Sequence, residues 1–224
     1  MRALAIETAT TACAIALDDG ELVIERVLDT SRRHTEVLTP GIEALLAERS
    51  ITARDLARVV VDHGPGLFTG LRVGIAAAQA LARGLGVELV EVTSLELLAA
   101  SAHRDGHRGR LTALVDARRG ELFAQSFELG EGVVARGDAS VIGPSDLVAR
   151  WRGESQRPVL VGDGAARYRD LFEFSLEVTV LDIVVPSPRE ALAIGERRAP
   201  VELATPLYLR DADAVSNFAV RKAP

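Results

Sequence analysis

The stretch from His63 to Gly74, "HGPGLFTGLRVG", has the glycine content of a loop that could bind phosphate. A P-loop needs G-x-x-x-x-G-K-[ST], because its backbone amides surround the phosphates and its lysine reaches them. Here Gly66 and Gly70 have the wrong spacing, and leucine and arginine follow where lysine and a hydroxyl residue are needed. A dinucleotide loop, G-x-G-x-x-G, does not fit either, because one extra residue separates the second and third glycines. Amides at the start of a helix near Thr69 could still bind an anion.

Other patterns that could carry chemistry are equally weak. His103 and His107 lie four residues apart, a spacing that could bind one metal ion on a helix. The Asp-Gly pair between them indicates a connector, so we expect solvated linker residues. Cys13 is the single cysteine and has no evident histidine partner, and neither H-E-x-x-H nor G-x-S-x-G occurs. The sequence therefore predicts no catalytic residue and no metal site.

Composition limits the class of protein. The chain has 224 residues, 48% of them hydrophobic, and a net charge of −6 with only 4% aromatic residues. These values favour a folded α/β protein and argue against an independent nucleic-acid binder, which usually has a basic face and stacking aromatics. No apolar run approaches the ~20 residues that a membrane helix needs. The lone cysteine excludes a disulfide framework, so we expect a cytoplasmic protein that makes no membrane contact.

Strand and helix patterns occur in the same order in each half of the chain. Three apolar runs with hairpin turns are followed by helix, strand, helix, strand and helix, and the order then repeats. Glu7 and Asp116 hold equivalent places at the ends of the first strands of the two halves. We expect two lobes, 1–103 and 110–204, facing each other across a cleft, with room for the segment at about 205–224 to pack back on the first lobe. Pro40-Gly41 should kink or split the first helix.

The helix from about residue 69 to 85 is non-polar over more of its circumference than a surface helix needs. At roughly 100° per residue, one face fits the lobe's own sheet: Leu71, Gly74, Ile75, Ala78, Leu81, Ala82 and Leu85. Arg72, Gln79 and Arg83 form a narrow polar strip. A third face has no side chain larger than valine, so it either lies under another helix of the same lobe or contacts a second protein.

A series of motifs resembles one family. They are "AIETATTACAIALDDG", "RRHTEVLTPGIEALL", "GPGLFTGLRVG", "VTSLELLA", "VDARRGELFA", "VGDGA" and "PLYLR". Together they span residues 3 to about 210 and are similar to the TsaB family, the dimerization subunit of the bacterial tRNA threonylcarbamoyladenosine complex. The resemblance implies an α/β fold of two tandem RNase H-like lobes, of the actin, sugar kinase and Hsp70 type.

The resemblance also implies a non-catalytic scaffold. Such a subunit pairs with a homologous catalytic subunit of the TsaD family and an ATPase of the TsaE family, which together modify the adenosine beside the anticodon of tRNAs reading codons that begin with A. Contact with tRNA is then indirect, and the chain forms a homodimer when its partner is absent. The expected partner-binding residues are Thr69, Val73, Ala76, Ala77, Ala80 and Gly84, with His34, Val37 and Leu38 on the 34–48 helix. The residues expected to shape the preceding loop are Gly64, Pro65, Gly66 and Gly70.

A nucleotide cleft is the alternative that the same fold leaves open. In nucleotide-binding relatives, acids at these strand ends position metal and water around phosphates. The residues that could form a vestigial cleft are Glu7, Thr8, Thr10, Asp116, Gly162 and Gly164. The threonines and glycines could equally serve only to form turns. We expect that the protein requires no cofactor, and weak binding of ATP or ADP with magnesium stays open. The rival functions are a small ATP-dependent transferase or kinase that uses this cleft, and a purely homodimeric structural protein.

Two further positions bear on catalysis. The catalytic relatives hold their metal with two histidines four residues apart, and Ser94 and Leu98 occupy those places here. Neither residue can replace an imidazole ligand. Arg118 and Arg119, at a turn of the second half, could contact a partner or tRNA phosphate, or simply be exposed.

Overall fold

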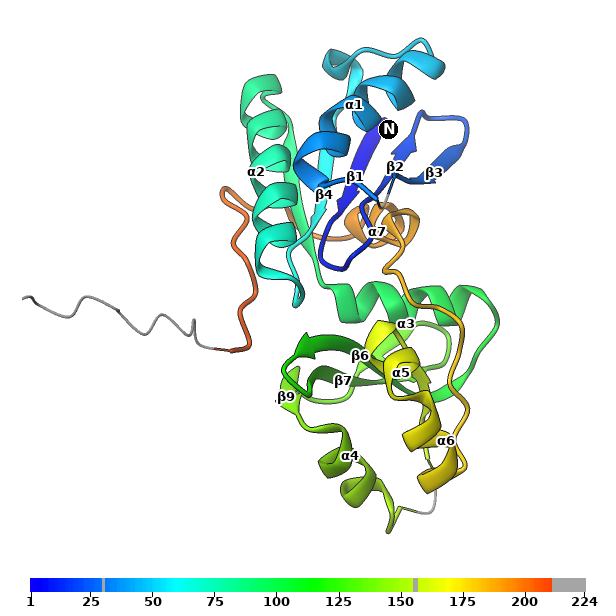
Figure 1. The fold of residues 1–224 in the computed structure, drawn as a ribbon. Helices are drawn as coiled ribbons and strands as arrows, with labels where there is room; N and C mark the ends of the chain where they lie inside the picture. The colour runs from blue at the N-terminus through cyan, green and yellow to red at the C-terminus, as the bar shows by residue number, and fades with distance from the viewer. Residues whose placement is uncertain (30, 155–156, 211–224) are drawn as a thin grey trace, which may run out of the picture.

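The computed structural model describes residues 1–29, 31–154 and 157–210 and places them in two lobes, each built on a mixed sheet (Figure 1). The first sheet has five strands in the order β3-β2-β1-β4-β5. β1, β2 and β3 pair antiparallel, whereas β4 and β5 run parallel to β1. The strands are β1 Ala3–Glu7, β2 Ala14–Asp18, β3 Val23–Val27, β4 Arg58–Asp62 and β5 Glu88–Val92. β1 is buried along its whole length because helices cover both faces of the sheet.

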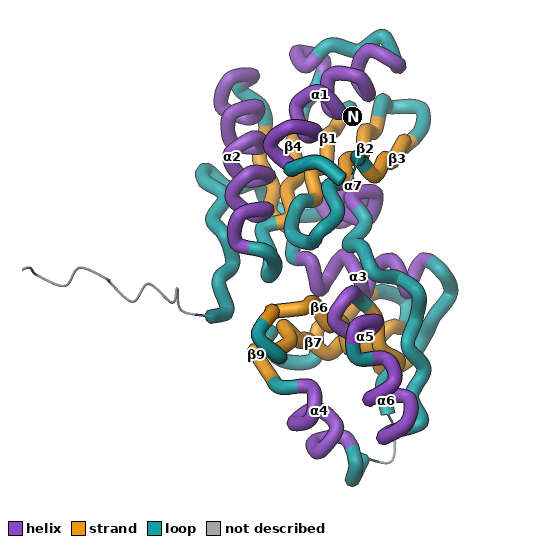
Figure 2. The backbone as a smooth tube through the Cα atoms, viewed as in Figure 1, coloured by secondary structure: helices purple, strands orange, loops and turns teal. Residues whose placement is uncertain are grey.

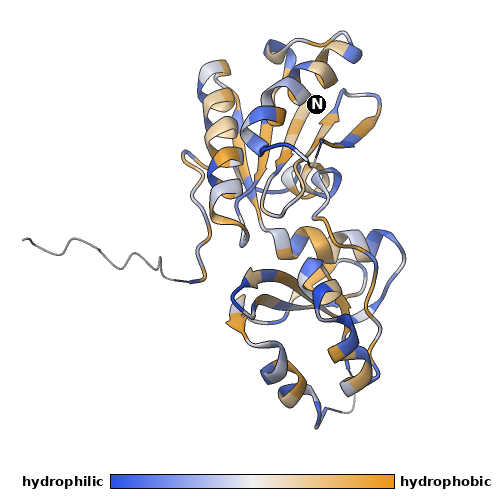
Figure 3. Cartoon of the chain, in the orientation of Figure 1, coloured by the Kyte–Doolittle hydropathy of each residue, from blue (hydrophilic) through white to orange (hydrophobic). Residues whose placement is uncertain are grey.

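Helices on the two faces of the first sheet take alternate side chains of the strands. α1 (His34–Glu48) and α2 (Phe68–Leu85) pack with Leu4 and Ile6 on one face. α7 (Pro188–Gly195) packs with Ala3 and Ala5 on the other face. This period-2 alternation is what a central strand requires when it is covered on both sides. Figure 2 shows the three helices around the strands, and Figure 3 shows that α2 is coloured hydrophobic along much of its length.

The position of α7 corrects the expected domain division. The boundaries 110–204 put this helix in the second lobe, but it contacts β1, β2 and β4 of the first. Gly195 allows the close approach, because a Cβ there would lie 2.7 Å from a methyl carbon of Val60. The chain therefore returns to the first lobe before residue 205. Residues 201–208 also lie on the first lobe, where the amide of Val201 donates to the carbonyl of Leu89 at 2.7 Å. Leu209 packs against the core of the second lobe, and residues 211–224 of the expected returning segment are outside the described residues.

The second lobe is built on a long hairpin. Its sheet has the order β10-β6-β7-β8, with β9 also paired to β7 and β10 parallel to β6. The strands are β6 Gly109–Arg118, β7 Glu121–Leu129, β8 Val133–Ala135, β9 Ser140–Ile142 and β10 Val159–Val161. The helices are α4 Pro144–Trp151, α5 Asp163–Arg167 and α6 Arg169–Leu176. The last strand expected from the repeated order, at residues 177–182, contributes only a bridge between Val180 and Leu160, so the second half is a shortened copy of the first.

α3 (Ser94–Arg104) lies between the lobes and belongs to both. Leu97 packs into the core beneath α7, while Leu95 and Leu98 pack into the core of the second lobe. An ion pair of 2.7 Å between Arg104 and Glu190 further joins α3 to α7. A helix buried on both sides in this way joins the lobes firmly.

α1 is continuous through Pro40, so the predicted split does not occur. Gly41, next to it, lies against Leu28, where a Cβ would come within 2.7 Å of a methyl carbon. Gly41 thus lets α1 lie close against the chain that precedes it.

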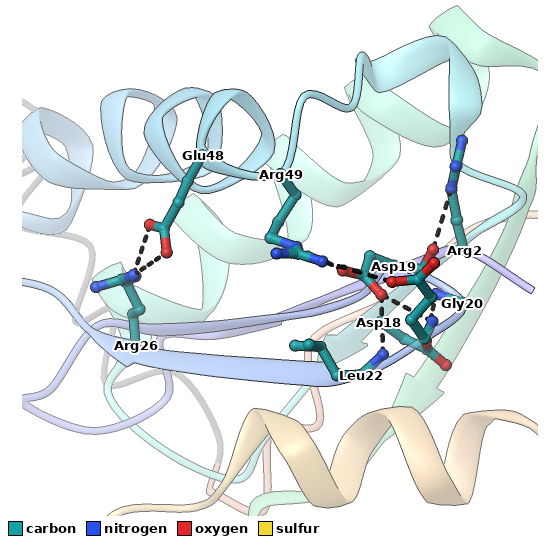
Figure 4. A network of polar contacts seen from close by, with 9 residues as sticks. Arg2, Asp18, Asp19, Gly20, Leu22, Arg26, Glu48 and Arg49 are labelled. Atoms are coloured by element: carbon teal, nitrogen blue, oxygen red, sulfur yellow. Dashed lines mark hydrogen bonds and ion pairs between the residues drawn. The ribbon is translucent and has the colours of Figure 1, made fainter.

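A polar network holds the C-terminal end of α1 to the β2–β3 turn (Figure 4). The Asp19 carboxylate accepts from the amides of Glu21 and Leu22 and from Arg49 Nε at 2.6 Å. These bonds, those from the backbone first, lower the pKa of Asp19 to about 2. A lowered carboxyl pKa favours the folded state above about pH 4, and that contribution is lost as the pH falls through the folded value. The C-terminal end of α1 is thereby fixed to the edge of the first sheet.

Candidate functional site

The inner face of α2 lies on its own sheet, as the periodicity predicts. Of the seven residues assigned to that face, Leu71, Gly74, Ile75, Ala78 and Ala82 are buried. The other two are half-buried and pack against the same core. The helical period alone was enough to find this face.

The third face of α2, which we call the small-residue face, is open to solvent. Thr69, Ala76, Ala80 and Gly84 are exposed, and Val73 and Ala77 are half-buried. With α1 this face forms a groove of about 480 Å³. The groove is lined by Thr35, Leu38, Thr39, Phe68, Thr69, Arg72, Val73, Ala76 and Ala77. Within the described chain, this flank is not covered by another helix of the same lobe.

The residues predicted on α1 contribute less to this groove. Val37 and Leu38 are buried, at 7% and 2% exposure, in the core of the first lobe. Of the two, only Leu38 reaches the groove. His34 is half-buried, and its ring Nε2 lies 3.3 Å from the carbonyl of Thr11. Val37 therefore cannot be a contact residue, because its side chain faces the core.

The glycine turn before α2 closes on the turn between β1 and β2. A Cβ at Gly66 would lie 2.2 Å from the Ala9 carbonyl oxygen, and one at Gly70 would lie 2.1 Å from that of Thr8. Only glycine permits such contacts with backbone atoms. The amide of Leu67 donates to the Ala9 carbonyl at 2.6 Å. Gly64 has a φ of 114°, and its peptide bond to Pro65 is cis.

The acid at the end of β1 does not face the space between the lobes. Glu7 is 0% exposed, and its carboxyl oxygens accept from the amides of Ala9 and Thr10. Burial, followed by the negative charge of Asp62, raises the pKa of Glu7 well above its usual range. Thr8 and Thr10 are also buried, and the Thr8 hydroxyl donates to the Gly70 carbonyl at 2.9 Å. None of these three residues can reach a phosphate group.

The equivalent acid of the second lobe does border a pocket. A pocket of about 480 Å³ lies between the start of α2, the β6–β7 turn and residues 207–210, with Asp116 in its wall. The Asp116 carboxylate accepts from Arg118 Nη1 at 3.1 Å and from Arg167 Nη1 at 3.0 Å. Arg118 and Arg119 both have a left-handed backbone, with φ of 64° and 54°. Because arginines already neutralise Asp116, the pocket suits an anion better than a metal ion.

The glycines at the start of α5 serve packing. A Cβ at Gly162 would lie 2.1 Å from the Leu114 carbonyl oxygen, and one at Gly164 would lie 2.9 Å from the same atom. Both positions are therefore limited to glycine by the approach of α5 to β6. Of the six residues predicted for a nucleotide cleft, only Asp116 lines the pocket. The residues present do not fit a magnesium–nucleotide site.

Metal ligands do not gather in the described part of the chain. No three His, Cys, Asp or Glu side chains there come close enough to hold a metal ion. His103 Nε2 lies 3.0 Å from the Gly130 carbonyl. Ser94 donates to Asp62 at 2.9 Å, and Leu98 is fully buried. Burial raises the pKa of the Cys13 thiol to about 12, which leaves it a poor nucleophile.

Three residues beside the groove were not singled out as site residues. Phe68 and Tyr208 are both about half exposed and stack with ring centroids 5.4 Å apart. The Arg72 guanidinium lies 3.6 Å over the Phe68 ring and donates through Nε to the Tyr208 hydroxyl at 3.0 Å. Gln79, the next residue on the polar strip, donates to the Ala204 carbonyl at 2.6 Å. The polar strip of α2 therefore binds residues 204 and 208 of the segment that follows α7. In the sequence, the signal for this contact was the isolated pair Arg72 and Gln79 on an otherwise non-polar helix.

None of the helices in the described residues is both long enough and apolar enough to cross a membrane.

Comparisons with known proteins give one consistent match. The family model for TsaD, tRNA N6-adenosine threonylcarbamoyltransferase, matches residues 28–148. The tRNA threonylcarbamoyladenosine biosynthesis protein TsaB of Escherichia coli is 31% identical and aligns with 100% of this chain and 99% of its own length. The protein of the same name from Bacillus subtilis is 30% identical, over 97% of this chain and 98% of its own. The solved structure of YeaZ from Pseudomonas aeruginosa superimposes with a TM-score of 0.81 at 26% identity, covering 93% of this chain and 99% of that one. These matches and the two mixed sheets confirm the predicted fold, two RNase H-like lobes of the actin type.

Proposed function

Because the chain belongs to the TsaB family, we propose that it is a non-catalytic subunit that pairs, through the small-residue face of α2, with a homologous catalytic subunit of the TsaD family. The relatives place the chain in tRNA threonylcarbamoyladenosine biosynthesis. The observation that carries the finer proposal is the groove between α1 and α2. Six α2 residues line it. Phe68 and Arg72 are the large ones, and the other four, Thr69, Val73, Ala76 and Ala77, are no larger than valine.

The shape of this face suits a helix as the partner. Helices pack with their axes 8–10 Å apart, and the shorter distances need small side chains at the contact. Ala76 and Ala80 are exposed and one turn apart, so a partner helix could lie close along them. Because the two subunits are homologous, the same helix of each could meet across an approximate two-fold axis. The same face would join two copies of this chain when the partner is absent.

The site residues favour a scaffold over an enzyme. Glu7 is buried, Asp116 is held by arginines, and Ser94 and Leu98 cannot ligate a metal. A small ATP-dependent transferase or kinase would need acids that reach substrate in the pocket between the lobes. Pairing with an ATPase of the TsaE family and an indirect role of tRNA stay predictions from the family, and a cytoplasmic location stays a prediction from the composition.

Reconstitution tests this proposal. Threonylcarbamoylation of tRNA should require this chain in addition to the catalytic subunit and the ATPase, and the isolated chain should show no turnover. The measurement is incorporation of labelled threonine into tRNA with and without the chain. Full activity in its absence, or turnover by the chain alone, would contradict the proposal.

A further inference from the structure

Two acidic side chains meet in the core of the first lobe, beneath the turn that begins α2. Glu7 ends β1 and Asp62 ends β4, and these strands are parallel neighbours with Ile6 opposite Val61. Both acids are 0% exposed. Charged groups buried in this way are stable only when they are paired or neutralised.

The hydrogen bonds of the pair tie three segments together. Glu7 accepts from the turn at residues 9–10. Asp62 Oδ1 accepts from the amide of Gly64 at 2.8 Å and from the Ser94 hydroxyl at 2.9 Å. The two acids therefore join the β1–β2 turn, the glycine turn and the start of α3.

Positive charge around the pair is sparse among the described residues. His63 is the basic side chain that acts on Asp62, but its ring Nδ1 lies 2.9 Å from the Thr205 carbonyl and 3.6 Å from Glu91. Cys13, which directly precedes β2, is the other titratable group near Glu7, and it stays neutral because its pKa is raised. Two ionised carboxylates at this place would repel each other without a full counter-charge.

One atom of the pair is left without a donor. Asp62 Oδ2 is buried and no hydrogen-bond donor is assigned to it, although the side chains of Glu7 and Asp62 are within hydrogen-bonding reach of each other. A proton on Glu7 would supply the missing donor. We infer that Glu7 and Asp62 form a proton-binding site, occupied at neutral pH, that fastens the β1–β2 turn, the glycine turn and the start of α3 to the sheet.

The direction of the shifts in pKa agrees with this geometry. Burial raises the pKa of both acids, that of Glu7 more strongly because Asp62 adds its charge. A raised carboxyl pKa contributes stability that is fully present below the ordinary value, 4.5 for Glu7. That contribution is lost as the pH rises toward the folded value, so in this range the folded chain holds a proton that the unfolded chain has released. The unfolding constant should then rise by up to about tenfold per pH unit.

Glu7→Gln tests the inference in the isolated chain, so the result does not depend on the proposed partner. Glutamine can accept from the amides of residues 9 and 10 through its carbonyl oxygen while its amide donates to Asp62 Oδ2. Urea unfolding between pH 5 and pH 9 should show that the wild-type chain loses stability with rising pH. Glu7→Gln should lose most of that slope and be the more stable chain at pH 8. His63 is present in both chains, so its contribution largely cancels in the difference.

Controls keep the inference falsifiable. Glu43→Gln, at an exposed position on α1, should keep the wild-type pH profile. A Glu7→Gln chain that keeps the full slope, or that is less stable than wild type at pH 8, would overturn the inference. If Glu7→Gln fails to fold, infrared spectroscopy of the wild-type chain at pH 7 decides. A carboxylic-acid C=O band that is retained after exchange into heavy water supports the shared proton, and its absence overturns it.

Discussion

Ala76→Glu is expected to weaken pairing with the catalytic subunit by at least about 100-fold, because it buries a charge without a partner in a helix–helix contact. Ala76 is exposed in the isolated chain and lines the groove between α1 and α2. The fold should therefore be unaffected, with an unchanged thermal unfolding midpoint. Calorimetric titration of the variant with the catalytic subunit measures the effect.

Ala193→Glu is the matched control. Ala193 is exposed on α7, on the opposite side of the same sheet, so the same charge is added away from the groove. It should pair like wild type. Ala77→Glu would be a less clean test, since Ala77 is half-buried and packs against the lobe's own core. Equal pairing by Ala76→Glu and Ala193→Glu would refute the proposed interface.

Gly70→Ala is expected to destabilise the isolated chain by about 2–3 kcal/mol, because the new methyl group overlaps a backbone oxygen that cannot move freely. The Cβ would lie 2.1 Å from the Thr8 carbonyl oxygen. For a chain of this size, the unfolding midpoint should fall by roughly 4–12 °C. Differential scanning calorimetry gives both quantities.

Gly84→Ala on the same helix is the control for this prediction. A Cβ at Gly84 meets nothing within 4 Å. Alanine there should therefore raise stability by about 0.5–1 kcal/mol through its greater helix propensity. If Gly70→Ala is as stable as wild type, the glycine turn does not need its close contact with residues 8–9.

The sequence predicted what repeats along the chain. The buried residues of α2 recur at helical spacing, so its inner face and its small-residue face were both found. The alternation of β1 side chains between the two faces of the sheet likewise follows from period 2. The fold was predicted from the order of the motifs along the chain, because the local spacing of apolar residues alone does not specify how the elements are arranged.

The sequence could not show which side chains meet across the fold. Glu7 looked like a cleft acid because it ends a strand, but the glycine turn closes over it. Its neighbour Asp62 gave no signal, since their contact joins two strands more than fifty residues apart. The placement of α7 was missed for the same reason, because an amphipathic helix fits either sheet. Val37 was expected to bind the partner, whereas its place on α1 directs its side chain into the core.

Cysteine labelling tests the central claim, that a partner covers the small-residue face of α2, most directly. The native Cys13 is buried and its pKa is raised to about 12, so an introduced cysteine should be the single reactive thiol. Ala80→Cys places it on the exposed flank of α2, and Ala193→Cys places it on α7 as the control. Labelling with a maleimide should slow strongly at position 80, and not at 193, when the catalytic subunit is bound. Labelling of Ala80→Cys at the same rate in the complex and in the free chain would contradict the account.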